Sequence, residues 1–305
     1  MLVYCLSPYT YLQTALCTTN GWSVGEMEAK AFPDGERYHR LLTDPNDRDC
    51  LLIGSTYDDT LTLDLYDLAS AIAGYGARSL TILLPYYAYS TMERAVLSGE
   101  VVKAKTRARL LSSLPRPGRG LHILLLDLHS EGIPHYFENG LHAVHLYAKP
   151  VVLAAIRQAG GEDFVLASTD AGRAKWVESL AADLGVTPAF VYKQRISGSE
   201  TRLTGVNADV AGKQVVIYDD MVRTGGSLLR AAEAYHQAGA SGVAAVATHI
   251  LCPGDALSRL AAAGTLQALH GTNSLPRAVA LANQTDFLRL HDIAGVFGSY
   301  LQTMQ

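Results

Sequence analysis

The sequence is poor in cysteine and in charged residues, and it has no long hydrophobic run. Its four cysteines (Cys5, Cys17, Cys50 and Cys252) lack CxxC or Cys/His spacing, so neither a zinc site nor a disulfide framework is indicated. We interpret them as reduced, mostly buried thiols. Apolar runs such as 123–126 and 243–247 are far shorter than the roughly 20 residues that span a bilayer.

An excess of charge of one sign is also absent. Lys and Arg number 25 against 29 Asp and Glu, a net charge of −4, which argues against a nucleic-acid partner. The first ten residues, MLVYCLSPYT, lack the basic segment of a secretory signal. We therefore expect a cytoplasmic protein with no membrane partner.

The chain has enough apolar residues for a large core. With 305 residues, 49% hydrophobic and 18% charged, its composition excludes disorder, collagen and coiled coil, and its length fits one large or two medium domains. Short runs rich in Leu, Val and Ile alternate with Ala-rich stretches of helical period, which predicts an α/β fold with buried parallel strands. The expected strands are Cys50–Gly54, Leu80–Leu84, Ile123–Asp127, Phe164–Ser168, Val215–Tyr218 and Val243–Thr248.

A weak internal repeat indicates two related halves. The segments AIAGYGARSLTILLPYY from Ala71 and AYHQAGASGVAAVATH from Ala234 both predict a helix, a Gly-Ala turn and a buried strand. We place the domain boundary near 142–150, which gives domains 1–145 and 146–290. We expect a final segment, 291–305, to pack back on the first domain.

The strongest chemical signal is VVIYDDMVRTGGS, residues 215–227. A predicted strand is followed by the carboxylates of Asp219 and Asp220, which suit the hydroxyls of a ribose. A turn then opens an Ala-rich helix at Leu228, and its inward-pointing amides and hydroxyls would form a phosphate cradle. The cradle residues are Thr224, Gly225, Gly226 and Ser227.

Taken alone, an Asp-Asp pair after a strand is equally well a helix cap, and a Gly pair is an ordinary tight turn. Here strand, acids and glycines occur together in one order. The segment resembles the phosphoribosyl-diphosphate (PRPP) loop of type I phosphoribosyltransferases and PRPP synthetases.

Five further segments distinguish these two families, and with them the chain resembles the ribose-phosphate pyrophosphokinases (PRPP synthetases) over nearly its whole length. A phosphoribosyltransferase that consumes PRPP would leave the first two segments unexplained. The segments are FPDGE (32–36), PYYAYSTMER (85–94), DLH (127–129), STDAG (168–172) and YKQR (192–195).

The resemblance implies two phosphoribosyltransferase type I-like α/β domains, each with a mainly parallel central sheet flanked by helices. It implies Mg²⁺-dependent transfer of the β,γ-diphosphoryl group of ATP to the C1 hydroxyl of ribose 5-phosphate. The first domain would carry the ATP side and the oligomer contacts, and the second the ribose-phosphate loop. The family also implies a homo-oligomer, a dimer or a hexamer-of-dimers type of assembly.

Residue roles follow from the same resemblance. Lys193 and Arg195 match the family's catalytic lysine and arginine, and cations suit a reaction that concentrates negative charge. His129 and Asp170 would hold Mg²⁺ together with the ATP phosphates. The residues assigned to ATP are Phe32, Asp34, Glu36, Arg94 and His129.

Each assignment has a plainer alternative. A KxR pair is usually part of a solvated loop, and a histidine at a strand end commonly makes a structural hydrogen bond. The tripeptide Pro-Asp-Gly forms a turn easily. The tyrosine pair Tyr86–Tyr87 would pack against a subunit or a base, and the sequence does not distinguish these.

Two departures from the family bear on the substrates. Thr91, Met92 and Glu93 stand where the family has Arg-Gln-Asp, so the usual ATP contacts are missing, although Arg94, Lys103 and Lys105 keep positive charge nearby. A non-catalytic regulatory homologue would explain that loss. Arguing against it are the retained Lys193, Arg195, His129 and Asp170.

The second departure is Arg223, which replaces an acid in the phosphate loop. A guanidinium there adds an anion-binding group for a second phosphate. We therefore hypothesise that the acceptor is a larger 5′-substituted ribose such as ADP-ribose. The alternatives are that Arg223 points to solvent or pairs with a nearby acid.

Overall fold

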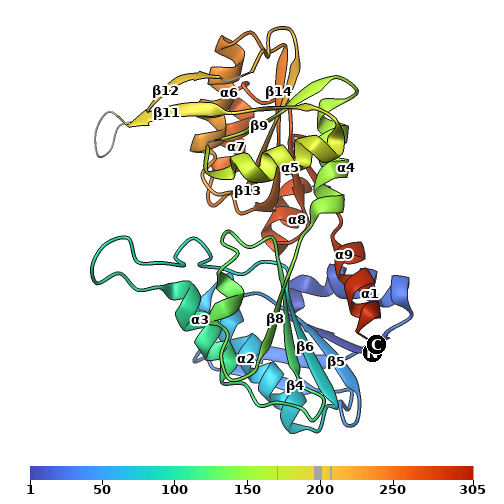
Figure 1. Cartoon of the computed structure of the whole chain (residues 1–305). Coiled ribbons are helices and arrows are strands. Elements are labelled where there is room, and N and C mark those ends of the chain that lie inside the picture. Colours follow the sequence, from blue (N-terminus) through green and yellow to red (C-terminus); the bar gives the residue numbers. More distant parts are fainter. Residues whose placement is uncertain (170, 196–200, 207, 305) are drawn as a thin grey trace. The chain divides into compact units, whose positions relative to one another are not determined.

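The computed structural model describes residues 1–169, 171–195, 201–206 and 208–304, and for 171, 192–195 and 201–206 the backbone alone. The chain divides into two compact units (Figure 1). Unit 1 is Met1–Tyr147 with Ala294–Gln305, and unit 2 is Ala148–Ile293.

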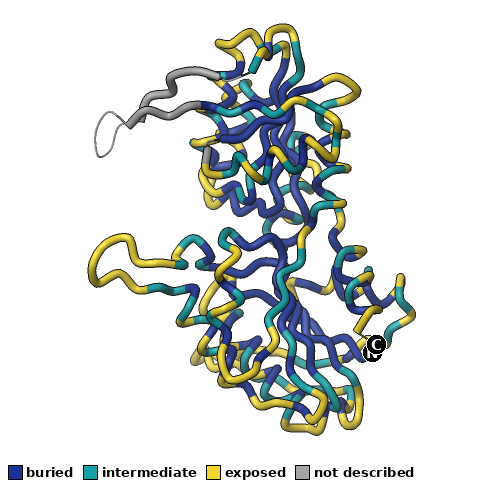
Figure 2. The backbone as a smooth tube through the Cα atoms, viewed as in Figure 1, coloured by how far each residue is buried: buried dark blue, intermediate teal, exposed yellow. Residues whose placement is uncertain are grey.

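Unit 1 is built on a six-stranded parallel sheet with the order β2-β1-β5-β6-β7-β8. Its inner strands are buried along almost their whole length, because runs such as Leu80–Leu84 are apolar on both faces (Figure 2). The strands are β1 (Leu2–Cys5), β2 (Ser23–Val24), β5 (Asp49–Ile53), β6 (Ser79–Leu84), β7 (Leu121–Leu126) and β8 (His142–Leu146).

Helices and one hairpin complete unit 1. The antiparallel hairpin of β3 (Met27–Ala31) and β4 (Arg37–Leu41) is inserted between β2 and β5. The C-terminal helix packs on the first one, and Gln302 Nε2 donates to Asn20 Oδ1 at 2.7 Å. The helices are α1 (Thr10–Asn20), α2 (Asp59–Gly74), α3 (Lys103–Ser112) and α9 (Ala294–Thr303).

Unit 2 repeats this plan with a parallel sheet of order β10-β9-β13-β14-β15-β16 and an antiparallel hairpin of β11 (Val191–Arg195) and β12 (Thr201–Val206). The sheet strands are β9 (Phe164–Ser168), β10 (Thr187–Ala189), β13 (Gln214–Val222), β14 (Gly242–Ile250), β15 (Leu269–Thr272) and β16 (Leu288–His291). The helices are α4 (Lys149–Gly160), α5 (Ala174–Leu184), α6 (Gly226–Gln237), α7 (Ala256–Ala262) and α8 (Pro276–Ala282).

The two units share one topology. In each, the first strand has the second on one side and the third sheet strand on the other, and a hairpin is inserted between the second and third. The repeat found in the sequence falls on the equivalent α2–β6 and α6–β14 steps. The predicted α/β fold with parallel sheets is confirmed, and all six predicted strands are present.

The predicted end of one strand is wrong by four residues. The strand expected to end at Tyr218 continues as β13 to Val222, which pairs with Ile250 of β14. Asp219 and Asp220 thus lie within the strand, because the neighbouring long strand β14 extends the ladder past the apolar run. All four cysteines lie in the described part of the chain and are buried, without disulfides. No helix in the described ranges is long and apolar enough to cross a membrane.

Candidate active site

The acid pair lies at the carboxyl end of β13 in unit 2, the edge where open α/β sheets bind ligands. Thr169, directly after the neighbouring strand β9, donates its hydroxyl to Asp219 Oδ2 at 3.1 Å. Arg173 Nη2 lies 2.6 Å from Asp220 Oδ2, and the Asp220 side chain is buried. The two carboxylates are therefore held in fixed positions by partners from the adjoining segment.

Burial and the neighbouring Asp220 raise the pKa of Asp219 to about 7, against the opposing attraction of Arg173. Two carboxylates this close disfavour simultaneous ionisation. A ligand that donates hydroxyl hydrogens to the pair would stabilise the ionised form. The site thus suits a neutral diol such as that of a ribose.

The turn between β13 and α6 has the backbone of an anion cradle. Gly225 precedes the helix with φ +75°, and a Cβ there would lie 2.5 Å from Leu260 Cδ2, so only glycine fits. No side chain caps α6, and its first turn contains no acid. Arg223, Thr224 and Ser227 are exposed around this turn. The backbone N–H groups at the start of α6 have no side-chain cap, so they can donate to a bound anion, which the helix dipole also favours.

The predicted catalytic cations lie in the hairpin of unit 2. Lys193 and Arg195 belong to β11, whose backbone pairs with Leu203 and Thr201 of β12. They therefore lie on an antiparallel ribbon and not in a plain loop. Asp170 and the segment 197–199 lie outside the described residues.

The FPDGE segment forms the loop of the unit 1 hairpin, so the plain turn interpretation is correct as far as the backbone goes. Gly35 N–H donates to Phe32 O at 2.9 Å, and Glu36 N–H donates to Asp34 Oδ1 at 3.1 Å. The Phe32 side chain is 43% exposed and meets the Tyr38 ring edge to face at 6.1 Å. The loop thus presents an exposed aromatic ring and two exposed carboxylates.

A buried carboxylate fixes the base of this hairpin. Asp64 of α2 is buried and accepts from Arg37 Nε at 3.1 Å, while His39 Nε2 lies 3.6 Å away. Arg37 and His39 both belong to β4, so the ribbon is anchored to α2 by charge as well as by packing.

The segment after β6 separates into a buried and an exposed part. Tyr86 and Tyr87 are buried in unit 1, and Tyr87 donates its hydroxyl to Ala104 O at 2.7 Å. Both are core residues, which neither sequence interpretation predicted. Arg94 is exposed, with its Nε 3.6 Å from Glu93 Oε1.

His129 follows β7, the strand beside β6, and is partly buried. Among the described residues, no group of three or more His, Cys, Asp or Glu is placed to hold a metal. Mg²⁺ in nucleotide enzymes commonly takes one or two protein carboxylates and completes its shell with phosphate oxygens and water. Of the two predicted Mg²⁺ ligands, His129 is described, and Asp170 lies outside the described residues.

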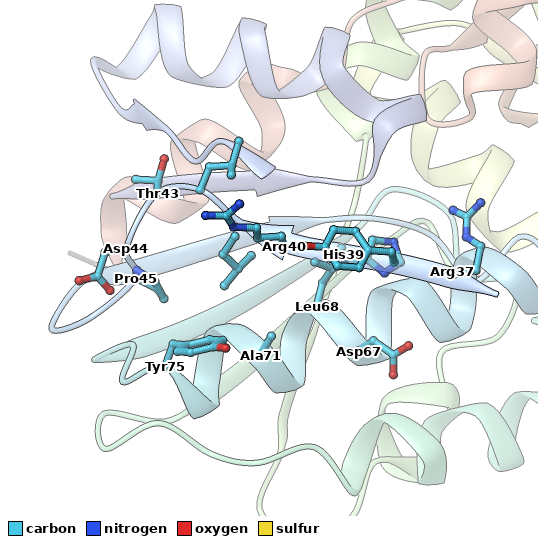
Figure 3. Close-up of a pocket in the computed structure, with 13 residues that line it drawn as sticks. Arg37, His39, Arg40, Thr43, Asp44, Pro45, Asp67, Leu68, Ala71 and Tyr75 are labelled. Atoms are coloured by element: carbon cyan, nitrogen blue, oxygen red, sulfur yellow. The ribbon is translucent and has the colours of Figure 1, made fainter. Parts of the chain in front are cut away.

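A pocket of about 620 Å³ in unit 1 lies beside the hairpin and is lined by β4, the loop after it and α2 (Figure 3). Arg37, His39 and Arg40 come from β4, Asp67 comes from α2, and Tyr75 directly follows α2. None of the residues predicted from the sequence lines it. The predicted site lies instead at the carboxyl ends of the strands and in the two hairpins.

Comparison with known proteins agrees with this arrangement. The N-terminal domain of ribose phosphate pyrophosphokinase matches residues 1–114, and the phosphoribosyl transferase domain matches residues 151–261. A ribose-phosphate pyrophosphokinase from Pyrococcus abyssi is 30% identical over 86% of this chain and 88% of its own. One from Gloeobacter violaceus is 33% identical over 84% of this chain and 76% of its own.

The chain belongs to the ribose-phosphate pyrophosphokinase family. Membership of that family makes it an enzyme of the transferase class. The crystal structure of phosphoribosylpyrophosphate synthetase from Mycobacterium smegmatis superposes with a TM-score of 0.86, at 26% identity, over 99% of this chain and 98% of that one. The predicted pair of phosphoribosyltransferase-like domains is thereby confirmed.

The sequence reasoning missed the residues that hold the acid pair of this pyrophosphokinase-family chain. Thr169 and Arg173 flank the Asp170 that was singled out, so the signal was a polar cluster directly after a predicted strand. Their partners lie about 50 residues away along the chain. Only the parallel pairing of β9 with β13 brings the two segments together.

Proposed function

We propose that the protein transfers the β,γ-diphosphoryl group of ATP to the C1 hydroxyl of ribose 5-phosphate, giving PRPP and AMP. The hydroxyl oxygen forms a bond to the β phosphorus. The bond from that phosphorus to the oxygen bridging to the α phosphate breaks, AMP leaves, and the hydroxyl proton is released to solvent. The observation that carries the proposal is the juxtaposition of a fixed acid pair and an uncapped glycine turn in a chain of this family.

We assign the acceptor to unit 2. Asp219 and Asp220 accept hydrogen bonds from the ribose hydroxyls, and the turn from Thr224 to Ser227 binds the 5′-phosphate with backbone amides and hydroxyls. Gly225 supports this assignment, because its positive φ and its contact with Leu260 exclude any larger residue. An anion at the start of α6 is also favoured by the helix dipole.

We assign Lys193 and Arg195 to the transferring group, where positive charge stabilises the charge that develops in the transition state. Mg²⁺, held by His129 and Asp170 together with the nucleotide, would neutralise phosphate charge when bound. Unit 1 would then provide the nucleotide contacts, from Phe32, Asp34, Glu36, Arg94 and His129.

The exposure of the hairpin loop supports a homo-oligomer, a dimer or a hexamer-of-dimers type of assembly. An exposed ring such as Phe32 is suited to reach a nucleotide held by a neighbouring copy. We accordingly propose that unit 1 also makes the oligomer contacts, and that the protein works in the cytoplasm on small-molecule substrates.

A second acceptor is favoured by one observation. Arg223 is an exposed residue at the start of the phosphate turn, and its positive charge there favours an acceptor with a second phosphate. ADP-ribose is such an acceptor.

Product analysis tests the proposal. The purified protein is incubated with ATP and Mg²⁺, with ribose 5-phosphate and ADP-ribose in separate reactions, and AMP and the diphosphorylated product are quantified. AMP with PRPP is the expected result. AMP only with ADP-ribose would instead make Arg223 a specificity residue, and no AMP with either acceptor would indicate a non-catalytic homologue.

A further inference from the structure

A cluster of charged and aromatic side chains in unit 1 has no role in the assignments above. The Tyr89 ring has Lys103 Nζ at 4.8 Å and Arg107 Cζ at 5.3 Å from its centre. Lys103 and Arg107 are four residues apart on α3, so they share one face of the helix. Two cations are thus held over a single ring.

Within the part of the chain that the structure describes, one carboxylate contacts this cluster. Asp59 pairs with Arg107 Nη2 and accepts from the Tyr89 hydroxyl at 3.4 Å, but the Asp59 side chain is 71% exposed. One exposed carboxylate thus faces two cations, which leaves an excess of positive charge.

Arg107 also has an unused donor. Its Nε is buried and has no hydrogen-bond partner among the described residues. Buried donors are nearly always paired, and a guanidinium carries five N–H groups in a fixed fork. The rest of the guanidinium is partly exposed, the side chain being 23% accessible, so a ligand anion can reach its edge beside the Lys103 ammonium group.

The cluster is built on a rigid frame. Tyr89 is held at φ +60°, in the left-handed region that residues other than glycine rarely adopt. The preceding residues are fixed to the loop after β5, since Ser55 Oγ donates to Tyr86 O at 3.2 Å and Ala88 N–H donates to Thr56 Oγ1 at 2.9 Å. The ring over which the two cations lie is therefore fixed before a ligand binds.

The cluster also lies where a ligand is expected. Asp59 and Tyr89 follow the carboxyl ends of β5 and β6, which are neighbours in the sheet, and His129 follows the next strand, β7. Thr91 and Met92, in the same segment as Tyr89, carry no charge. The two cations that lie over the Tyr89 ring come from α3.

We propose that Lys103 and Arg107 form an anion subsite that binds the phosphates of the donor nucleotide. This inference rests on the proposed function and names residues for its donor side. The ammonium group supplies a point charge and the guanidinium a directional fork, a combination suited to a polyphosphate. Asp59 competes with the ligand for Arg107.

Calorimetric titration of the full chain with inorganic tripolyphosphate tests the subsite without any turnover. Lys103→Gln and Arg107→Gln should each weaken binding roughly tenfold, as expected when a charge-assisted hydrogen bond is lost. Lys103→Arg, which keeps the positive charge, should bind tripolyphosphate nearly as tightly as the wild type. Asp59→Asn, which removes the competing carboxylate, should bind it more tightly. Arg109→Gln is the matched control, because Arg109 lies on the same helix but pairs with Glu138 at 3.0 Å.

The outcomes separate the subsite from the reaction. Unchanged tripolyphosphate affinity in folded Lys103→Gln and Arg107→Gln proteins, verified by thermal melting, would overturn the subsite even if the protein makes AMP. An equal loss in Arg109→Gln would also overturn it, as a general charge effect. If the wild type makes no AMP but its tripolyphosphate binding depends on Lys103 and Arg107, the proposed reaction fails and the subsite stands.

Discussion

The turns β5–α2 and β13–α6 occupy equivalent positions in the topology of the two units, but a side chain caps the helix in the first and not in the second. In unit 1 the Asp58 carboxylate caps α2 by accepting from Leu61 N–H at 2.8 Å, and Asp59 is the first helical residue. In unit 2 Gly225 precedes α6, no side chain caps the helix, and no acid lies in its first turn. A shared topology thus supports two different electrostatic environments.

The difference shows how a duplicated fold divides its work. A helix start has unpaired N–H groups that either a side chain or a ligand must satisfy. In unit 1 the Asp58 side chain satisfies one of these N–H groups, that of Leu61. In unit 2 no side chain does so, and that turn is the phosphate cradle of our proposal.

The largest effect is expected from the hairpins, which are inserted at equivalent places in the two units. Lys193→Ala and Arg195→Ala should each lower kcat by about 100-fold or more, the size of a lost transition-state contact. Arg40→Ala, in the hairpin of unit 1, is the control and should leave kcat nearly unchanged. Steady-state kinetics with both substrates saturating measures this, and near-normal kcat in both unit 2 variants would remove them from the mechanism.

The next effect concerns the open turn itself. Gly225→Ala should lower the free energy of unfolding by about 2–4 kcal/mol, because it combines a clash with Leu260 and a strained positive φ. Gly226→Ala should cost less than about 1 kcal/mol, since its nearest contacts would be ordinary ones, Arg230 Nη1 at 3.4 Å and Thr224 Oγ1 at 4.0 Å. Urea unfolding compares the two, and equal losses would refute the special role of Gly225.

The acid pair makes unit 2 sensitive to pH. Since the pKa of Asp219 is raised from 3.8 to about 7, the folded state binds a proton that the unfolded state releases, and stability falls as pH rises from about 4 to about 7. Asp219→Asn should remove this part of the slope and stabilise the protein at pH 8 by on the order of 1–2 kcal/mol. Thermal melts of both proteins from pH 4 to 8 measure it, and parallel curves would contradict the raised pKa.

A smaller effect is expected from placing an acid in the first turn of α6, as in the first turn of α2. Ser227→Asp places a carboxylate in the first turn of α6, which should stabilise the helix by about 0.3–1 kcal/mol and weaken ribose 5-phosphate binding roughly tenfold. Ser227→Ala, which adds no charge, should weaken binding less. Calorimetric titration gives both affinities, and tight binding by the aspartate variant would place the phosphate elsewhere.

The smallest effect tests the closed turn. Asp58→Ala removes the cap of α2 and should cost about 1 kcal/mol, which lowers Tm by about 2–4 °C in a protein of this size. The affinity for ribose 5-phosphate should not change, because we assign this acceptor to the turn of unit 2. A large loss of affinity would mean that the two turns are not divided in the way we describe.

Much of the fold could be predicted from the sequence, because a strand buried on both faces of a parallel sheet has a local run of mostly apolar residues, such as Leu80–Leu84. Strands without such a run were not found. The polar hairpin β3–β4 is one example, since its strands contain no buried residue and Arg37 of β4 pairs with Asp64 of α2. The end of β13 was missed because its polar residues are in the sheet only by pairing with β14.

The candidate site also contains a part that a local sequence motif predicts and a part that it does not. The order Asp219, Asp220, Gly225 and Gly226 is local, so a motif identifies it. The partners of Asp220 and the cations over Tyr89 depend on contacts between segments distant in sequence, which no local pattern contains. Tyr87 was ambiguous for the same reason, because its hydroxyl partner belongs to a helix that begins 16 residues later.

The packing of α9 on α1 has a consequence for biosynthesis. The hydrogen bond between Gln302 and Asn20 joins residues 282 positions apart, so unit 1 lacks its last helix until the whole of unit 2 has been translated. Unit 2 is continuous in sequence and can fold on the ribosome while unit 1 is still incomplete. The nascent chain should therefore complete its domains in the reverse of the order in which they begin.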